Sequence, residues 1–233
     1  MVQQLVGTSV ASDDQPAVER RIPMTFEEYQ AWWGEGQRGE WVDGEVIVFV
    51  APLVVHQRIA GFVYRLLADF VDDRDFGEVF QSPVDMRLRD GGSYREPDVL
   101  FVAAENAGHV ERRWVDGPAD LAIEVVSDDS ARRDRKDKFD EYAGAGVREY
   151  WVIDPRPLRQ RFAAYTLTEE GYYDRIEADE RGVVTSTVIR GFWLDPAWLW
   201  MDPLPKPRSI LELIEATGEP APPPTPAILS VKE

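Results

Sequence analysis

Two carboxylates of this 233-residue chain lie on apolar segments of strand length, where a charge is costly to bury. Glu124 stands in the middle of the run DLAIEVVS, residues 120–127, which is typical of a strand buried on both faces. Desolvating an isolated carboxylate costs several kcal/mol unless it is paired, protonated or bound to a metal. Asp98 directly precedes the apolar run 99–102. If the two runs form neighbouring strands, both carboxylates can approach one point. Taken alone, Asp98 is better explained as a solvated residue at the start of a strand.

Two hard anionic oxygens without a thiolate or a histidine pair nearby suit Mg²⁺ or Mn²⁺ rather than Zn²⁺. A cation is available in segment 131–138, which holds five basic and two acidic residues. Phe139 and Tyr142 define the buried face of the helix expected there, and Lys138 lies near the boundary of that face. We therefore expect Lys138 to reach toward the carboxylates. The other basic residues of the segment are expected on a solvated surface: Arg132, Arg133, Arg135 and Lys136.

Hydrophobic periodicity predicts the elements that must position these residues. A short helix with Thr25 as N-cap is followed by a hairpin around Asp43-Gly44, and helical spacing predicts a long helix over 55–71. Residues 103–118 are interpreted as a loop. Further strands are expected near 79–89, 99–102, 120–126, 149–153, 161–167, 171–178 and 183–189, with helices over 131–143 and near 210–214. This order predicts an α/β fold: a mixed central sheet flanked by helices, with an added N-terminal hairpin and a C-terminal antiparallel meander.

Three regions are expected along the chain. Residues 1–21 are polar and aperiodic and are interpreted as a flexible leader, 22–215 as a single domain, and 216–233 as a Pro-rich tail that cannot build a core. No apolar run approaches the roughly 18–20 residues that span a bilayer, so no membrane contact is expected. The first residues lack the basic start and apolar core of a secretory signal, so the cytoplasm is the expected compartment.

The composition excludes several classes of site. The absence of cysteine rules out disulfides, thiolate metal sites and cysteine nucleophiles. A net charge of −17, from 26 basic and 43 acidic residues, argues against a non-specific nucleic-acid binder, because phosphate binding draws on clustered Lys and Arg. The segment 131–138 is a local positive exception.

The chain also contains an ordered series of short motifs that cover most of its length. The series is Glu40-Trp41-Val42-Asp43-Gly44-Glu45, His56, Pro97-Asp98, Glu124-Val125-Val126-Ser127, Lys138 with Tyr142, Gly146-Val147-Arg148-Glu149-Tyr150-Trp151 and Asp154. Over about residues 23–200 it resembles the Uma-type family of "putative restriction endonucleases", which belongs to the PD-(D/E)XK nuclease superfamily. Pro-Asp alone would be a weak signal, but the ordered series is specific.

The resemblance implies a restriction-endonuclease-like fold and phosphodiester hydrolysis dependent on Mg²⁺ (or Mn²⁺). Asp98 and Glu124 would be metal ligands, with the backbone carbonyl of Val125 as a third. The superfamily's lysine usually follows the glutamate by two residues, but Val126 occupies that position here. The resemblance therefore needs a lysine from the following helix, and Lys138 is the candidate for orienting or activating water and stabilising charge on phosphorus.

Three accessory residues match family positions. Glu40 would reach the metal through water, or else is an exposed charge at the start of the hairpin. His56 would contact a phosphate or hold a carboxylate, or else makes only a local hydrogen bond at its helix start. Glu45 is kept as an accessory candidate. Many nucleases of the superfamily dimerise to cut both strands, so a homodimer is a further expectation.

Three hypotheses about the whole protein remain open at this point. The first is a metal-dependent endonuclease acting on nucleic acid, with DNA favoured over RNA. The second is a catalytically inactive nuclease-fold module that binds nucleic acid or a protein partner, which the charge of −17 favours. The third is an α/β domain in which an internal arginine satisfies Glu124 without a metal.

Overall fold

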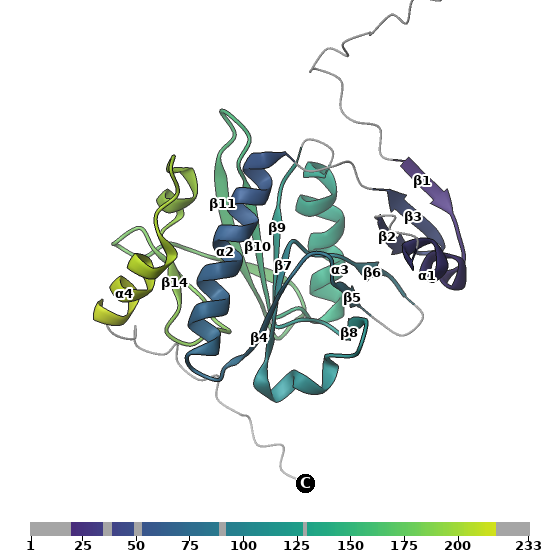
Figure 1. The fold of residues 1–233 in the computed structure, drawn as a ribbon, viewed down its shortest axis with the longest axis horizontal. Helices are drawn as coiled ribbons and strands as arrows, with labels where there is room; N and C mark the ends of the chain where they lie inside the picture. The colour runs from purple at the N-terminus through teal and green to yellow at the C-terminus, as the bar shows by residue number, and fades with distance from the viewer. Residues whose placement is uncertain (1–19, 35–38, 49–52, 89–91, 128–129, 218–233) are drawn as a thin grey trace, which may run out of the picture.

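A six-stranded mixed sheet forms the centre of the computed structural model, which describes residues 20–34, 39–48, 53–88, 92–127 and 130–217. The strand order is β12-β11-β10-β9-β7-β4 (Figure 1). Only β9 and β10 run parallel; the other neighbouring pairs are antiparallel. The strands are β4 (Gly77–Gln81), β7 (Val99–Ala103), β9 (Leu121–Val125), β10 (Glu149–Asp154), β11 (Arg161–Leu167) and β12 (Tyr173–Ile176).

Helices cover the sheet on both faces (Figure 1). One face packs against α2 (Val54–Asp72), whose apolar stripe is continuous with α4 (Pro207–Thr217). The other face packs against α3 (Lys138–Ala145), which follows a turn of π-helix at Arg133–Asp137. None of the helices in these described ranges combines the length and apolarity needed to cross a membrane.

The alternation of side chains along β9 decides which face receives the central carboxylate. Ile123 and Val125 belong to the core beneath α2, whereas Ala122 and Val126 belong to the core beneath α3. Because neighbouring side chains of a strand point to opposite faces, Glu124 lies on the α3 side, together with Ala122 and Val126.

A smaller unit formed by the N-terminal elements packs beside the central sheet (Figure 1). Its three-stranded sheet has the order β1-β3-β2, with α1 between the first two strands in sequence. The elements are β1 (Arg20–Pro23), α1 (Phe26–Gly34), β2 (Gly39–Val42) and β3 (Glu45–Val48). Thr25 and Glu28 exchange side-chain to backbone hydrogen bonds of 3.2 and 2.8 Å, which is a capping box that starts α1 as predicted.

A second small sheet, in the order β6-β5-β8, lies between the N-terminal unit and the central sheet. Its strands are β5 (Asp85–Arg87), β6 (Tyr94–Arg95) and β8 (Trp114–Asp116). The strand expected over 79–89 is therefore split between β4 and β5, which belong to different sheets. Splitting one apolar run between two sheets depends on long-range packing, which periodicity does not encode.

Some boundaries differ from the sequence prediction. The expected loop at 103–118 contains a 3₁₀ helix at Ala104–His109 as well as β8. The leader was expected to reach residue 21, but β1 begins at Arg20, and the tail was expected from residue 216, but α4 continues to Thr217. The expected strand over 183–189 is only β13 (Val184–Thr185), which pairs with an unpredicted β14 (Trp193–Leu194). The remaining leader and tail residues, 1–19 and 218–233, lie outside the described residues.

Candidate metal and catalytic site

The strand order places Asp98 and Glu124 at the same end of two neighbouring strands, β7 and β9. β7 and β9 are antiparallel neighbours with Val99 opposite Ile123, so the start of β7 lies beside the end of β9. Oδ2 of Asp98 accepts a hydrogen bond from the backbone N–H of Val125 at 2.7 Å. Glu124, the preceding residue, is only 3% exposed. The two strands are therefore neighbours, as the predicted approach of the two carboxylates requires.

The buried ammonium of Lys138 joins this pair of carboxylates from the neighbouring helix. Its Nζ lies 2.8 Å from Oε1 of Glu124 and 2.8 Å from Oε1 of Glu40. The hydroxyl of Tyr142, one helical turn later, donates to the same Oε1 of Glu124 at 2.8 Å. The inward position expected for Lys138 is confirmed. Among the described residues the side-chain partners of Glu124 are this lysine and this tyrosine, so the internal cation that pairs with Glu124 is a lysine and not the arginine of the third hypothesis.

Glu40 is completely buried and does not behave as an exposed charge at a hairpin start. Both of its oxygens are engaged: Oε1 also accepts the backbone N–H of Glu96 at 3.0 Å, and Oε2 accepts a guanidinium N–H of Arg95 at 2.8 Å. Burial alone would raise the pKa of Glu40, but the positive charges of Lys138, Arg95 and Arg133 outweigh it and lower the pKa to about 2. Glu40 is thus a permanently ionised anchor for Lys138.

Sequence reasoning missed several charged residues around this anchor. Arg95 donates to both oxygens of Glu141 at 2.7 Å as well as to Glu40, and it is 2% exposed. Asp134 is buried, with Oδ1 3.8 Å from Nζ of Lys138. The spacing of four residues between Asp134 and Lys138 was the one available signal. Nothing local marked Arg95, because its partners are 55 and 46 residues away in the chain.

Arg133 is also buried, against the expectation that it lies on a solvated surface. The expectation assumed a regular α-helix over 131–143, whereas Arg133–Asp137 form a π-helical turn. A π-turn contains an additional residue, which shifts the facing of residues before it relative to those after it. Arg133 therefore points inward, with Nε 4.0 Å from Oε2 of Glu40. The relation between Lys138 and Tyr142 is unaffected, because both follow the π-turn.

The site raises the pKa values of both its central acid, Glu124, and its central base, Lys138. Burial raises the pKa of Glu124 well above its usual value; the charges of Asp134, Asp98 and Glu40 act in the same direction, and Lys138 opposes them. Burial alone would lower the pKa of Lys138, but the negative charges of Glu124 and Glu40 raise it above the ordinary lysine value. Lys138 is therefore an ammonium at neutral pH and suits electrostatic stabilisation rather than proton abstraction.

His56, at the start of α2, holds a carboxylate, as one of its expected roles required. Its Nε2 lies 3.3 Å from Oδ2 of Asp98. Burial would lower the pKa of His56, but the hydrogen bond and charge of Asp98 raise it overall, with the backbone of Val125 acting in the same direction. Glu45 does not join the cluster: its ion pair within the described residues is with Arg21, at 3.5 Å on the N-terminal sheet.

Each candidate metal ligand retains one carboxylate oxygen that no described residue engages. The side-chain contacts of Asp98 fall on Oδ2, and those of Glu124 fall on Oε1. Mg²⁺ is commonly bound through one or two carboxylates while keeping several waters, so this donor set fits it. Within the described ranges no group of three or more His, Asp or Glu side chains is arranged to hold a metal. A metal here would complete its shell with water or backbone oxygen, and the Val125 carbonyl stays a predicted ligand.

Comparison with known proteins assigns the chain to a family. The model of the Uma2 family, described as "Putative restriction endonuclease", matches residues 26–197, which is most of the chain. This chain belongs to the Uma2 family. A relative from Synechocystis sp., named "Uncharacterized protein sll1609", is 29% identical to this Uma2 chain over 119 residues. That match covers 51% of this chain and 67% of the relative.

A solved structure shows the same fold. The crystal structure of "a putative nuclease belonging to DUF820" from Anabaena variabilis matches this Uma2 chain with a TM-score of 0.62 and 16% sequence identity. The match covers 76% of this chain and 98% of the other. At this identity the likeness shows the fold alone. The predicted α/β architecture, a mixed central sheet flanked by helices, is confirmed.

Proposed function

We propose that this Uma2 protein is a metal-dependent endonuclease that hydrolyses phosphodiester bonds of nucleic acid, with DNA favoured over RNA and Mg²⁺ or Mn²⁺ as the metal. One observation carries the proposal: Lys138 contacts Glu124 at 2.8 Å beside the Asp98 strand, while each carboxylate keeps an unengaged oxygen. The description of the family, "Putative restriction endonuclease", also supports hydrolysis of phosphodiester bonds.

Each residue has a defined role in this proposal. Asp98 and Glu124 would hold the ion, with the carbonyl of Val125 as a further ligand. A bound metal would act as a Lewis acid on a phosphoryl oxygen and would lower the pKa of a coordinated water. The ammonium of Lys138 would orient that water and stabilise the charge that develops on the phosphoryl oxygens. Glu40 and His56 are positioning residues, because Glu40 fixes Lys138 and His56 fixes Asp98.

The test is cleavage of single- and double-stranded DNA and RNA with Mg²⁺ or Mn²⁺. Asp98→Ala and Glu124→Ala should each lower cleavage at least about 100-fold, because the metal site provides most of the charge stabilisation. Glu149→Gln is the matched control: Glu149 is a buried carboxylate of β10 opposite Leu121, at the far end of β9 from the site. Cleavage that persists in both alanine variants would contradict the proposed site.

Metal binding is measured separately from cleavage, by thermal unfolding with and without Mn²⁺. A ligand that binds only the folded state stabilises it by about 2.7 kcal/mol at 100 times its dissociation constant. Wild type and Glu149→Gln should therefore melt at higher temperature with Mn²⁺. Glu124→Gln, which keeps the shape but not the charge of the ligand, should lose most of this increase. An equal increase in Glu124→Gln would show that the ion binds elsewhere.

The second candidate is a nuclease-fold module that binds nucleic acid or a protein without cutting. The net charge of −17 favours it, since a strongly acidic surface repels phosphates over most of its area. The same assays separate the candidates: nucleic-acid binding and Mn²⁺ stabilisation without cleavage of any substrate would select the module. For the nuclease we also propose a homodimer that cuts both strands. Sedimentation velocity tests whether the protein is a dimer.

A further inference from the structure

A pocket on the α3 face of the central sheet begins one strand away from Glu124. Its floor includes Val152 of β10 and Ala163 of β11, and the strand registers align Glu124 with Val152 and Val152 with Ala163. Neighbouring strands lie about 4.8 Å apart, so the floor extends from about 5 to about 10 Å from Glu124 across the sheet. Arg135 and Phe139 form the wall on the helix side.

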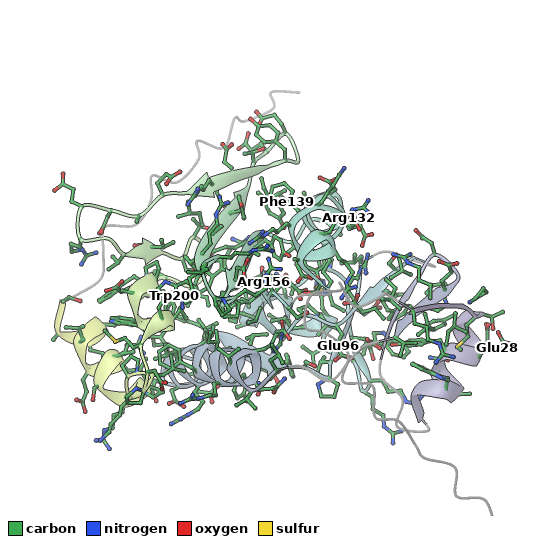
Figure 2. All side chains as sticks on the ribbon, turned by 90° about the horizontal axis from the view of Figure 1, so that it is seen from above. Glu28, Glu96, Arg132, Phe139, Arg156 and Trp200 are labelled. Atoms are coloured by element: carbon green, nitrogen blue, oxygen red, sulfur yellow. The ribbon has the colours of Figure 1, made fainter. Side chains whose placement is uncertain are left out.

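The rim of this pocket is built around a buried carboxylate. Asp154 ends β10 and is completely buried, and it forms ion pairs with Arg135 and Arg156. Burial would raise the pKa of Asp154, but the hydrogen bonds and charge of Arg156, together with Arg135, lower it. The carboxylate is therefore ionised and holds the two guanidinium groups at the edge of the sheet. Figure 2 looks onto this edge and shows Arg156 near the centre of the molecule, with Phe139 on the α3 side.

A third arginine adds positive charge that no acid in the described ranges neutralises. Arg161 stands opposite Asp154 in the β10–β11 register and is exposed at the pocket rim. Its side chain makes no hydrogen bond or ion pair with any described residue and is free to meet a ligand. The connecting segment 155–161 contains three arginines and no acidic residue. In a protein of net charge −17, this rim is a local site for an anion.

The helix-side wall and part of the floor of the pocket are aromatic. Phe139 from α3 and Tyr165 from β11 meet edge to face, with ring centroids 4.9 Å apart and an interplanar angle of 87°. Both side chains are only partly buried. Aromatic faces beside a positively charged groove are the usual means of holding single-stranded nucleic acid, because every base has a π-face to stack. Positively charged and apolar side chains are thus combined in one pocket.

We infer that this pocket binds one nucleotide of the substrate strand close to the scissile phosphate. Arg161 and Arg135 would contact a backbone phosphate, and the sugar or base would pack on Tyr165 and Phe139. Because the floor lies about 5 to 10 Å from Glu124 across the sheet, this nucleotide would be close along the strand to the phosphate bound there. The inference takes its substrate class from the proposed function, but it concerns binding and does not depend on cleavage.

The test measures binding of a fluorescein-labelled 12-nucleotide single strand in EDTA, by anisotropy over a series of salt concentrations. Arg161→Gln should weaken binding about 3- to 10-fold and lower the slope of log K against log salt by about 0.7, because one phosphate contact of the single strand is lost. Tyr165→Leu should weaken binding without changing the slope, because it removes a stacking surface but no charge. Arg208→Gln is the matched control, since Arg208 is 91% exposed on α4 over the opposite face.

The outcomes separate this inference from the proposed function. If Arg161→Gln binds with the affinity and salt slope of Arg208→Gln, the pocket does not hold a phosphate and the inference is wrong, whether or not the wild type cuts. If the wild type binds with the expected arginine effect but cuts no substrate with Mg²⁺ or Mn²⁺, the inference holds and the nuclease proposal fails. Absence of binding by the wild type to the single strand would also overturn the inference.

Discussion

Lys138 is surrounded by more negative charge than it can balance. Its Nζ lies 2.8 Å from both Glu124 and Glu40, and 3.8 Å from Asp134. Asp98 adds another carboxylate beside Glu124, and their mutual repulsion contributes to the raised pKa of Glu124. A divalent cation between Asp98 and Glu124 would relieve this repulsion. On the proposed function, the metal would add positive charge beside Asp98 and Glu124, while Lys138, Arg95 and Arg133 lie around Glu40.

Replacing Lys138 by methionine tests its chemical role, because methionine keeps most of the side-chain volume and removes the charge. We expect cleavage to fall at least about 100-fold while the Mn²⁺ affinity changes much less, since the ammonium acts on the reacting phosphate rather than on the ion. Lys136→Met, at an exposed position in the same segment, should leave both unchanged. Single-turnover cleavage and calorimetric Mn²⁺ titration measure the two quantities. Equal losses in rate and affinity would assign Lys138 to metal binding instead.

Asp85, which is not among the candidate metal ligands, is another acid with a perturbed pKa. Tyr29 donates to its Oδ2 at 2.9 Å, while Oδ1 is buried without a hydrogen-bond partner among the described residues. Burial raises the pKa of Asp85 to about 7, and the Tyr29 hydrogen bond opposes the shift without cancelling it. The folded state therefore favours the protonated acid. The stability this provides is complete below about pH 4 and is lost as the pH rises to about 7.

The variant Asp85→Asn stays neutral at every pH and should remove this dependence. Its free energy of unfolding relative to wild type should increase between about pH 4 and pH 7, then level off. The gain should be on the order of 2–4 kcal/mol at most, since each pKa unit corresponds to about 1.4 kcal/mol. Urea unfolding followed by fluorescence at pH 4, 6 and 8 measures it. A difference that stays constant over this range would show that the acid titrates normally.

At the scale of elements, Arg95 joins the N-terminal unit to α3, the helix that carries Lys138. It lies on β6, and its guanidinium contacts Glu40 of β2 at 2.8 Å and both oxygens of Glu141 of α3 at 2.7 Å. Glu40 in turn contacts Lys138, the first residue of α3. The hairpin that carries Glu40 is therefore part of the site, although it lies outside the central sheet.

Breaking this link should weaken both the fold and the site. Arg95→Met removes the hydrogen-bond donor to Oε2 of the buried Glu40 and leaves this oxygen only the Arg133 guanidinium at 4.0 Å. Loss of one partner of a buried ion pair costs about 3–5 kcal/mol. Arg58→Met removes an exposed ion pair to Asp202, where about 0–1 kcal/mol is expected. Urea unfolding at pH 7 compares the two variants. Equal small losses would mean that Arg95 does not hold the N-terminal unit in place.

At the scale of the whole molecule, charge is distributed unevenly around the sheet. The chain has a net charge of −17, yet the edge where β10 ends carries Arg135, Arg156 and Arg161 around one buried carboxylate. A local positive site within an acidic surface guides a polyanion to one location and repels it elsewhere. This distribution suits a nuclease with a restricted substrate better than a general nucleic-acid binder.

The hydrophobic cores indicate which part of the chain should fold by itself. The cores on both faces of the central sheet lie between Ile59 and Ile214. A shortened chain of residues 20–217, which adds the N-terminal sheet that holds Glu40, should keep the free energy of unfolding within about 0.5 kcal/mol of the full chain. Its cleavage rate should also match. Urea unfolding and cleavage of both chains test this, and a large loss in either would assign a role to the terminal segments.

The sequence by itself determined most elements and indicated residues of the candidate site. The long helix, the hairpin turn at Asp43-Gly44 and strand β11 follow from local periodicity and turn chemistry, which act over a few residues. Glu124 was identified because a carboxylate conflicts with an apolar strand, and that conflict is visible without coordinates. Lys138 was expected to turn inward from its position beside Phe139 and Tyr142.

Only the tertiary structure decided which residues meet. Glu40 is buried because Arg95 and Lys138 reach it from elements 55 and 98 residues away in the chain, and no local pattern encodes such pairings. The π-turn before Lys138 turns Arg133 inward, which a uniform helical period could not predict. The pocket at Arg161 depends on the register of β10 and β11, and its distance from Glu124 depends on the register of β9 and β10. Local sequence specifies the period of each element, whereas long-range packing decides strand order and register, and these place the charges of the site.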